Sequence, residues 1–172
     1  NYLLKEAEEC PSTVTSARPI AEIPSTITFA RPSYASRYRY EGFIKWIQSI
    51  LPKFTNLKAL DLRRVLGGNA GLTALVPVFQ QLTALETLDL SSNGISVEDM
   101  NFLAPALQQL TCLTSLNLSQ NLWRRKIQTQ QLFALNPLDV ESECMKKLAL
   151  AFQQLTALAS LDLSQNYLKS ER

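Results

Sequence analysis

The sequence is dominated by a fifteen-residue stretch that occurs three times with few changes. It reads FQQLTALETLDLSSN at 79–93, LQQLTCLTSLNLSQN at 107–121 and FQQLTALASLDLSQN at 152–166. The second copy begins 28 residues after the first, and the third begins 45 residues after the second. A recurring period of this length is typical of repeat proteins, in which each unit buries its apolar face only against its neighbours. A chain of this kind is therefore expected to fold by stacking similar units side by side.

Within each copy the leucines and one asparagine keep the spacing L-x-x-L-x-L-x-x-N, and an earlier copy keeps the leucines alone. Alternate residues of a strand point to opposite faces, so the last two leucines of each copy are expected to point inward. The asparagine that follows is expected to bond backbone groups of the bend after the strand. The four sets are Leu57, Leu60, Leu62 and Val65; Leu85, Leu88, Leu90 and Asn93; Leu113, Leu116, Leu118 and Asn121; Leu158, Leu161, Leu163 and Asn166.

This spacing resembles the leucine-rich repeat family over roughly residues 43–168. The 28-residue unit is similar to the ribonuclease-inhibitor-like subclass. The resemblance implies an α/β leucine-rich repeat solenoid, a horseshoe with a short parallel sheet on the concave face and helices on the convex face. It also implies recognition of another protein by the curved sheet. The wording of the repeats is similar to that of leucine-rich effectors of intracellular bacterial pathogens, which implies a host protein as the partner.

A helix is expected after each strand, because apolar residues there recur at helical spacing. Ser96 followed by Asp99 predicts a capping pair at one helix start. Pro77 and Pro105 occupy equivalent positions and predict that their helices are bent or begin late. Residues 43–57 are interpreted as the helix of a preceding, incomplete unit, so the sheet should hold at least four strands.

Two segments depart from the period. Residues 1–41 are rich in Pro, Ser, Thr and Arg, and we interpret them as an irregular N-terminal cap or linker. Residues 42–172 are assigned to the leucine-rich repeat domain. The long interval before the last copy places an insertion within 122–139, between a strand and its helix, so it should emerge at one rim of the solenoid.

The candidate partner-binding residues fall in two groups. Trp and Arg are enriched at binding hot spots, and loops on a rigid scaffold often carry function, so the insertion is the first group. Outward-pointing residues of the predicted strands form the second. The alternative for both groups is a structural role, with the aromatic residues packed on the core and the polar residues solvated. The candidates are Trp123, Arg124, Arg125, Lys126 and Phe133 in the insertion, and Asp61, Arg63, Asp89, Ser91, Asn117 and Asp162 on the strands.

Composition argues against several classes of function. The chain has no histidine, which removes the commonest general base and the commonest metal ligand. Gly67 and Gly68 are not followed by the Lys–Ser/Thr pair of a phosphate-binding loop. The net charge of +2 gives no support for a nucleic-acid or membrane partner. We therefore expect no catalytic residue, no metal and no cofactor.

Three cysteines without a CxxC pair indicate neither a zinc site nor a disulfide framework. Cys112 stands where the other copies have Ala84 and Ala157, and it is expected to be a small core residue.

The sequence thus predicts a non-catalytic protein-binding scaffold, working in the cytoplasm or secreted into a host cell cytosol as a bacterial effector. The alternative is the recognition domain of a larger enzyme, such as a ubiquitin ligase, whose catalytic part lies outside this chain. The last predicted strand has no further unit beside it in this sequence, so either more repeats follow or another chain covers its edge, and edge-to-edge self-association through this strand is a further expectation.

Overall fold

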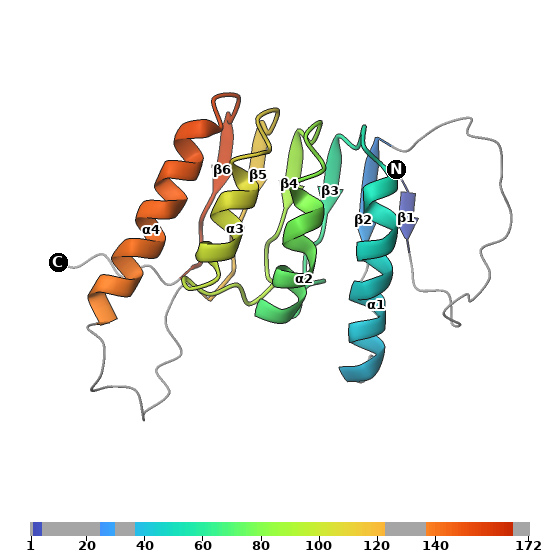
Figure 1. Cartoon of the computed structure of the whole chain (residues 1–172), viewed down its shortest axis with the longest axis horizontal. Coiled ribbons are helices and arrows are strands. Elements are labelled where there is room, and N and C mark those ends of the chain that lie inside the picture. The colour runs from blue at the N-terminus through green and yellow to red at the C-terminus, as the bar shows by residue number, and fades with distance from the viewer. Residues whose placement is uncertain (1, 5–24, 30–36, 123–136, 167–172) are drawn as a thin grey trace, which may run out of the picture.

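The computed structural model describes residues 2–4, 25–29, 37–122 and 137–166. Short strands alternate with helices along most of this length (Figure 1). The elements are β1 (Tyr2–Leu4), β2 (Thr26–Phe29), α1 (Arg37–Ile50), the 3-10 helix η1 (Leu51–Lys53), β3 (Ala59–Asp61), α2 (Asn69–Phe79), β4 (Thr87–Asp89), α3 (Met100–Leu107), β5 (Ser115–Asn117), α4 (Pro137–Gln154) and β6 (Ser160–Asp162).

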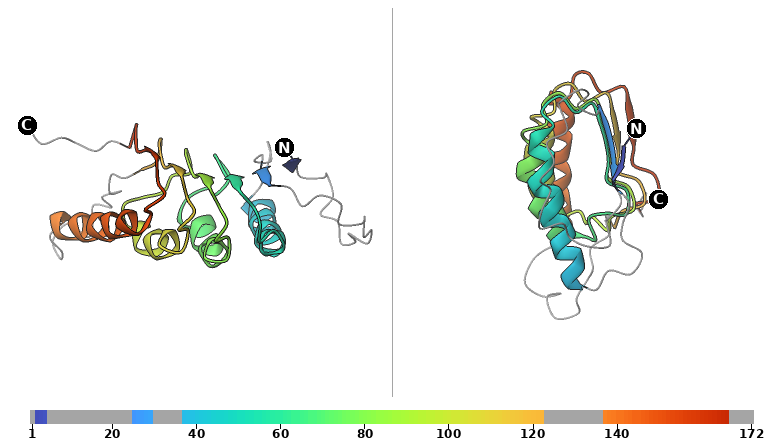
Figure 2. Two further views of the ribbon diagram at one scale, coloured as in Figure 1. Left: turned by 90° about the horizontal axis from the view of Figure 1, so that it is seen from above. Right: turned by 90° about the vertical axis from the view of Figure 1, so that its right-hand side faces the viewer.

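The six strands form one parallel sheet in the order of the sequence, β1 to β6. Parallel neighbours need a crossover connection, and from β2 to β6 a helix between successive strands provides it. The helices all lie on one face of the sheet, which leaves the other face without a helix layer (Figure 2). We call one strand with its following bend and helix a coil, and the uncovered side of the sheet the open face. This α/β arrangement agrees with a leucine-rich repeat type of fold.

The core lies between the sheet and the helices. The central leucines of β3, β4 and β5 are in register with one another, and Leu60, Leu88 and Leu116 are at most 1% exposed. The helices meet them with apolar residues such as Leu75 and Leu103. The prediction that the leucines of the repeat point inward is therefore confirmed for these coils.

The asparagines at the ends of the strands join neighbouring coils. Asn121 Nδ2 donates to the carbonyl oxygens of Leu90, at 3.1 Å, and of Leu118, at 2.9 Å. Its Oδ1 accepts the backbone N–H groups of Asn93, at 2.9 Å, and Ile95, at 3.1 Å. A buried amide with all these partners is costly to replace, because buried polar groups need hydrogen bonds. The structural role predicted for the asparagine column is confirmed.

One residue of each bend adopts a left-handed backbone conformation. Arg64, Ser92, Gln120 and Gln165 lie at equivalent positions and have φ between 56° and 59°. Residues other than glycine rarely adopt such angles. Because the same angle recurs in four coils, it belongs to the geometry of the bend rather than to one particular site.

The helices bear out part of the capping prediction. The Asp99 carboxylate accepts the backbone N–H of Ser96, at 2.8 Å, and its hydroxyl, at 3.0 Å. However, α3 itself begins only at Met100, so the pair holds the turn before the helix. Pro105 lies inside this short helix and Pro77 inside α2, so neither proline marks the start of its helix.

The region before β3 contains more regular structure than the sequence indicated. Both β1 and β2 lie within residues 1–41 and extend the parallel sheet, and α1 begins at Arg37. Phe29 of β2 packs edge-on against Phe43 and Trp46 of α1, with ring centroids 6.4 and 6.0 Å apart. These aromatic contacts close the core at this end of the described chain.

The expectation for Cys112 is wrong. Cys112 is an exposed free cysteine in the turn between α3 and β5. Its counterpart Ala84 is half-buried and Ala157 is exposed. The position accepts small residues because it belongs to a tight turn, and small size was misread as burial.

Candidate functional site

The open face is the first candidate site, because small polar side chains stand on it in columns. Strand pairing places Asp61, Asp89, Asn117 and Asp162 in one row across β3 to β6. These four residues align because each occupies the same position of its repeat, and the leucine spacing is the same in each coil. The structure thus brings together five of the strand residues that the sequence predicted, namely Asp61, Arg63, Asp89, Asn117 and Asp162.

Each member of the row is held by the backbone of its own coil. Asp61 accepts the backbone N–H of Arg63 at 2.9 Å. The same bond, to the residue two positions later, recurs at Asp89, Asn117 and Asp162 with distances of 2.8, 3.0 and 2.9 Å. An Asp or Asn side chain that bonds the backbone two residues later is fixed in one orientation. The row is therefore a preorganised set of polar groups.

Asp89 is the centre of a network across three strands. Arg63 Nη2 lies 3.1 Å from Asp89 Oδ2 and 3.8 Å from Asp61 Oδ2. Asn117 Nδ2 donates to the same Asp89 oxygen at 3.2 Å. Arg63 lies between the carboxylates of Asp89 and Asp61, so it offsets one of the two negative charges in the β3–β4 half of the open face.

Ser91 differs from the other candidates of the open face. It is only 4% exposed, and Ser119 in the next coil is also buried. Ser164, in the same column, belongs to the last described coil and is exposed, and Arg63 is exposed although β3 lies between β2 and β4. Ser91 therefore offers almost no surface to a partner, although its position in the column was predicted.

Asp162 has a distinct electrostatic environment. The backbone N–H of Ser164, followed by the Ser164 hydroxyl and that of Ser119, holds the pKa of this carboxyl below its ordinary value. Hydrogen bonds to the charged form of a carboxyl stabilise that form. Among the described residues, no lysine or arginine forms an ion pair with it. The β5–β6 half of the open face thus carries an exposed negative charge.

One more ion pair joins two coils, just before the amino ends of β3 and β4. Lys58 Nζ lies 2.7 Å from Glu86 Oε1, and Glu86 raises the pKa of Lys58. Both side chains are about half exposed, so this pair is screened by solvent and contributes little.

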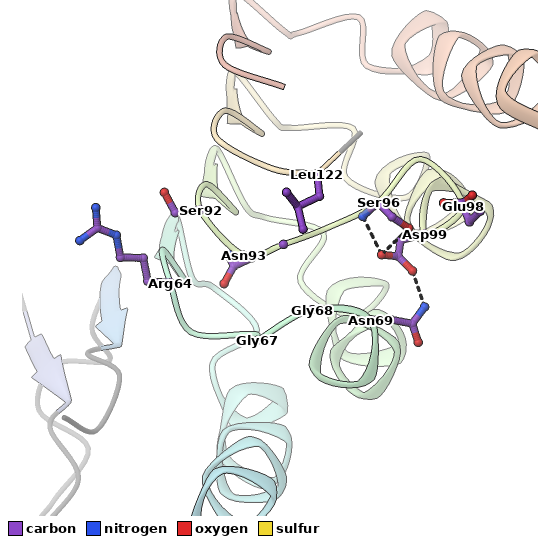
Figure 3. A pocket seen from close by; sticks show the side chains of 11 residues that line it. Arg64, Gly67, Gly68, Asn69, Ser92, Asn93, Ser96, Glu98, Asp99 and Leu122 are labelled. Carbon is purple, nitrogen blue, oxygen red and sulfur yellow. Dashed lines mark hydrogen bonds between the residues drawn. The ribbon is translucent and has the colours of Figure 1, made fainter. Parts of the chain in front are cut away.

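A shallow groove of about 610 Å³ lies at the rim where the strands end, and the sequence did not reveal it. Figure 3 shows that the loops after β3 and β4 form it, with Leu122 beside them. Its polar side chains bond one another: Asp99 accepts from both Ser96 and the Asn69 amide. We call it the rim groove; its lining is Arg64, Gly67, Gly68, Asn69, Ser92, Asn93, Gly94, Ser96, Glu98, Asp99 and Leu122.

The glycines of the rim groove are explained by the backbone. Gly67 and Gly68 have φ of 62° and 101°, and a Cβ on Gly71 would collide with the carbonyl group of Leu66. Glycine is the residue that tolerates such angles and such close approach. The glycine cluster therefore has a structural cause, and no ligand is needed to account for it.

The other group of predicted residues, Trp123, Arg124, Arg125, Lys126 and Phe133, lies outside the described residues. The described chain reaches Leu122, which is exposed beside the rim groove, and resumes with α4. Their role in binding stays a prediction. In the described part of the chain, no helix has the length and apolar character required to cross a membrane.

Comparisons with known proteins agree with the geometry. The family model described as Leucine Rich Repeat matches residues 84–109, which is about one unit of the period. No curated protein matches the chain. The matched unit contains β4 and α3, and the coils before and after it repeat its leucine spacing and its strand register. Together these findings support a leucine-rich repeat protein.

Proposed function

We propose that this chain is a non-catalytic scaffold that binds another protein through the open face. A leucine-rich repeat generally indicates a role in protein–protein binding, and the row from Asp61 to Asp162 gives that role a surface. The observation that carries the proposal is the backbone bond that fixes each member of the row. Side chains that are already ordered lose less conformational entropy on binding, so a partner is bound at lower cost.

The charge of the open face suggests the chemistry of the partner. Arg63 bridges the carboxylates of Asp61 and Asp89 and offsets one of their two charges, while Asp162 forms no ion pair with a lysine or arginine among the described residues. A partner that presents a basic side chain near β6 and hydrogen-bonding groups across β4 and β5 would complement this face. Complementary charge at an exposed position favours the rate and the specificity of association.

Three finer parts of the proposal come from the resemblance of the repeats. The partner is a host protein, the chain is a secreted bacterial effector, and the site of action is the host cytosol. The stacked coils are also proposed to curve into a horseshoe, which would turn the open face into a concave one. Solution scattering of the intact chain tests the horseshoe: a straight, rod-like particle would contradict the curvature.

The proposal is tested by two variants with the same substitution at two exposed threonines. Thr87 lies on the open face in β4, and Thr73 lies on α2 in the helix layer. Thr87→Arg places a bulky cation over the centre of the row and should abolish capture of a partner from a lysate of host-type cells. Thr73→Arg should leave capture unchanged. If both variants capture the same proteins as the parent chain, the open face is not the binding surface.

The insertion is tested separately. A triple alanine variant of Trp123, Arg124 and Arg125 removes the side chains predicted to act as anchors. If the insertion adds to binding, this variant should retain less partner than the parent chain, and retention should fall further when it is combined with Thr87→Arg. Equal retention by parent and triple variant would remove the insertion from the proposed site.

A further inference from the structure

The helix layer has an exposed aromatic residue at a position where the other units have none. Phe102 of α3 is 48% exposed, although α2 and α4 lie on either side of this helix (Figure 1). The same position of the repeat holds Ala74 in α2 and Lys147 in α4. The next residue, Leu103, faces the core and is completely buried. The exposure of Phe102 does not arise from an end of the chain, because its coil has a neighbour on both sides.

A second exposed apolar position lies one turn further along the helices. Pro105 follows Phe102 by three residues in α3, and residues three apart are neighbours on a helix surface. Its counterparts are Pro77 in α2 and Leu150 in α4, and all three are exposed, Leu150 by 53%. Because the position stays exposed in α2 and α3, which have a helix on both sides, it faces solvent throughout the layer.

Two lysines of α4 border these apolar residues. Lys146 and Lys147 precede Leu150 by one turn, so the three side chains are neighbours on the surface of α4. Lys147 Nζ donates to the side-chain oxygen of Asn101, 3.0 Å away, and Asn101 directly precedes Phe102. This bond joins α3 and α4 at the level of Phe102. Neither lysine forms an ion pair with a residue that the structure describes, so both charges are available.

These residues form one surface on two neighbouring helices. α3 and α4 pack against each other in the helix layer, on the side of the molecule opposite the open face (Figure 2). Single exposed apolar residues are ordinary on a protein, whereas adjacent ones rimmed by polar groups are typical of an interaction site. We call this surface the helix-face patch; it consists of Phe102, Pro105, Lys146, Lys147 and Leu150 and includes no residue of α2.

We propose that the helix-face patch binds an acidic amphipathic helix of a second partner protein. A docked amphipathic helix presents apolar side chains every three or four residues, and this matches the spacing of Phe102 and Pro105. Carboxylates beside that apolar face pair with Lys146 and Lys147. The chain then holds two partners at once, one on the open face and one on the helix layer. This inference goes beyond the open-face proposal and does not depend on it.

The charges of the patch distinguish an acidic helix from two other occupants. Two copies of the chain that met through their patches would bring like charges together, which is unfavourable. Basic segments that bind anionic membranes carry about four to eight lysines or arginines. The patch has Lys146 and Lys147 alone, with the exposed Glu143 one turn earlier in α4. A protein segment with a few carboxylates therefore fits this surface better than a bilayer does.

Titration of a synthetic helical peptide into the intact isotope-labelled chain, followed by NMR, tests the proposal. The acidic peptide carries leucines at every third or fourth position with glutamates beside them, and the control peptide has lysine in place of each glutamate. The acidic peptide should shift amide signals around Phe102 and Leu150, with a Kd below about 1 mM. It should bind about threefold or more tightly than the lysine peptide. Absent shifts, shifts confined to the open face, or equal affinities would overturn the proposal.

Charge reversal at equivalent positions of two helices locates the contact. Lys146 of α4 and Lys45 of α1 occupy the same position of the repeat, and both are exposed. Lys146→Glu should weaken binding of the acidic peptide about threefold and strengthen binding of the lysine peptide by a similar factor. Lys45→Glu should change neither. If the two variants have the same effect, the peptide responds to overall charge and the patch is not its site.

Phe102→Ala removes the aromatic side chain and should weaken binding of the acidic peptide about tenfold, as loss of a hot-spot residue does. Circular dichroism checks that the variant is folded, and the Lys146→Glu experiment is independent of that result. Thr87→Arg, on the open face, should leave peptide binding unchanged, so failure of this inference and failure of the open-face proposal are distinguishable. Unchanged binding by a folded Phe102→Ala would contradict the patch.

Two measurements without peptide test the other occupants. Sedimentation velocity of the chain alone would reveal association that Phe102→Ala abolishes, and this result would assign the patch to a second copy. Flotation with vesicles of phosphatidylserine and phosphatidylcholine would reveal membrane binding that the same variant abolishes. We expect neither effect, and either one would overturn the proposal of an acidic protein partner.

Discussion

The inner coil around β5 and the end coil around β6 carry almost the same sequence in different surroundings. LTSLNLSQN and LASLDLSQN share their leucines and their asparagine. Yet Leu116 is completely buried and Leu161 is 38% exposed. The difference lies in the neighbour that each coil has, because the apolar face of one coil is covered by the next. A leucine at a given position of the repeat therefore contributes more to stability when its coil has a neighbouring coil on both sides.

The largest expected effect is the loss of an inner leucine. Leu116→Ala should lower the free energy of unfolding by about 2–5 kcal/mol, because it leaves a cavity in a closely packed core. Leu161→Ala should lower it by about 1 kcal/mol, since part of that side chain is already in water. Denaturant unfolding at low protein concentration measures both. Equal losses would mean that the two coils are equally covered in solution.

The asparagine column should give the next largest effect. Asn121→Ala removes the acceptor of two buried backbone N–H groups and one donor to each of three carbonyl groups, at about 1–3 kcal/mol for each buried group that finds no other partner. Asn166→Ala removes fewer bonds, to Asn121, Leu118 and Leu163, and should cost less.

Gln109→Ala is the control for these asparagine variants. Gln109 is an exposed polar residue of the same repeat, and its loss should change the free energy of unfolding by less than about 0.5 kcal/mol. If Asn121→Ala were as mild as this control, the column would not join the coils as its bonds indicate.

The smallest expected effect is the pH dependence due to Asp162. Its pKa is lowered in the folded chain, so its contribution to stability is present above the ordinary value of 3.8 and is lost as the pH falls through the folded value. Asp162→Asn, which reproduces the Asn117 of the inner coil, should make the fall in unfolding midpoint between about pH 5 and about pH 2 shallower. The change should be small, because this carboxylate is exposed. An unchanged slope would mean that Ser164 does not bond the carboxylate in solution.

The candidate site could be predicted in part. The repeat indicated which strand residues stand in one row, and strand pairing confirmed the row from Asp61 to Asp162. The repeat pattern did not indicate that Ser91 would be buried between coils, and it did not indicate that Arg63 would bridge two carboxylates. Both depend on side chains of neighbouring coils, and such contacts are not encoded in the spacing of one copy.

The errors have a common cause. Cys112 was assigned to the core because its counterparts are small, but a tight turn also selects small residues. β1 and β2 were missed because TITF and YLL are too short to show a period and have no matching copy. The rim groove was not predicted from the sequence. Its glycines are required by positive φ angles and by a close backbone contact, and the pattern of polar and apolar residues reveals neither.

By itself, the sequence determined the repeat, its strand-and-helix unit, the inward leucines and the bonding role of the asparagines. Those features depend on side-chain periodicity and on local backbone chemistry, which are present in every copy. Only the tertiary structure decided which of the described copies are fully covered, how the polar residues of the open face pair, and how far the leucines of the last described coil are exposed. These properties depend on what lies beside a coil in space, and identical residues acquire different exposures and partners there.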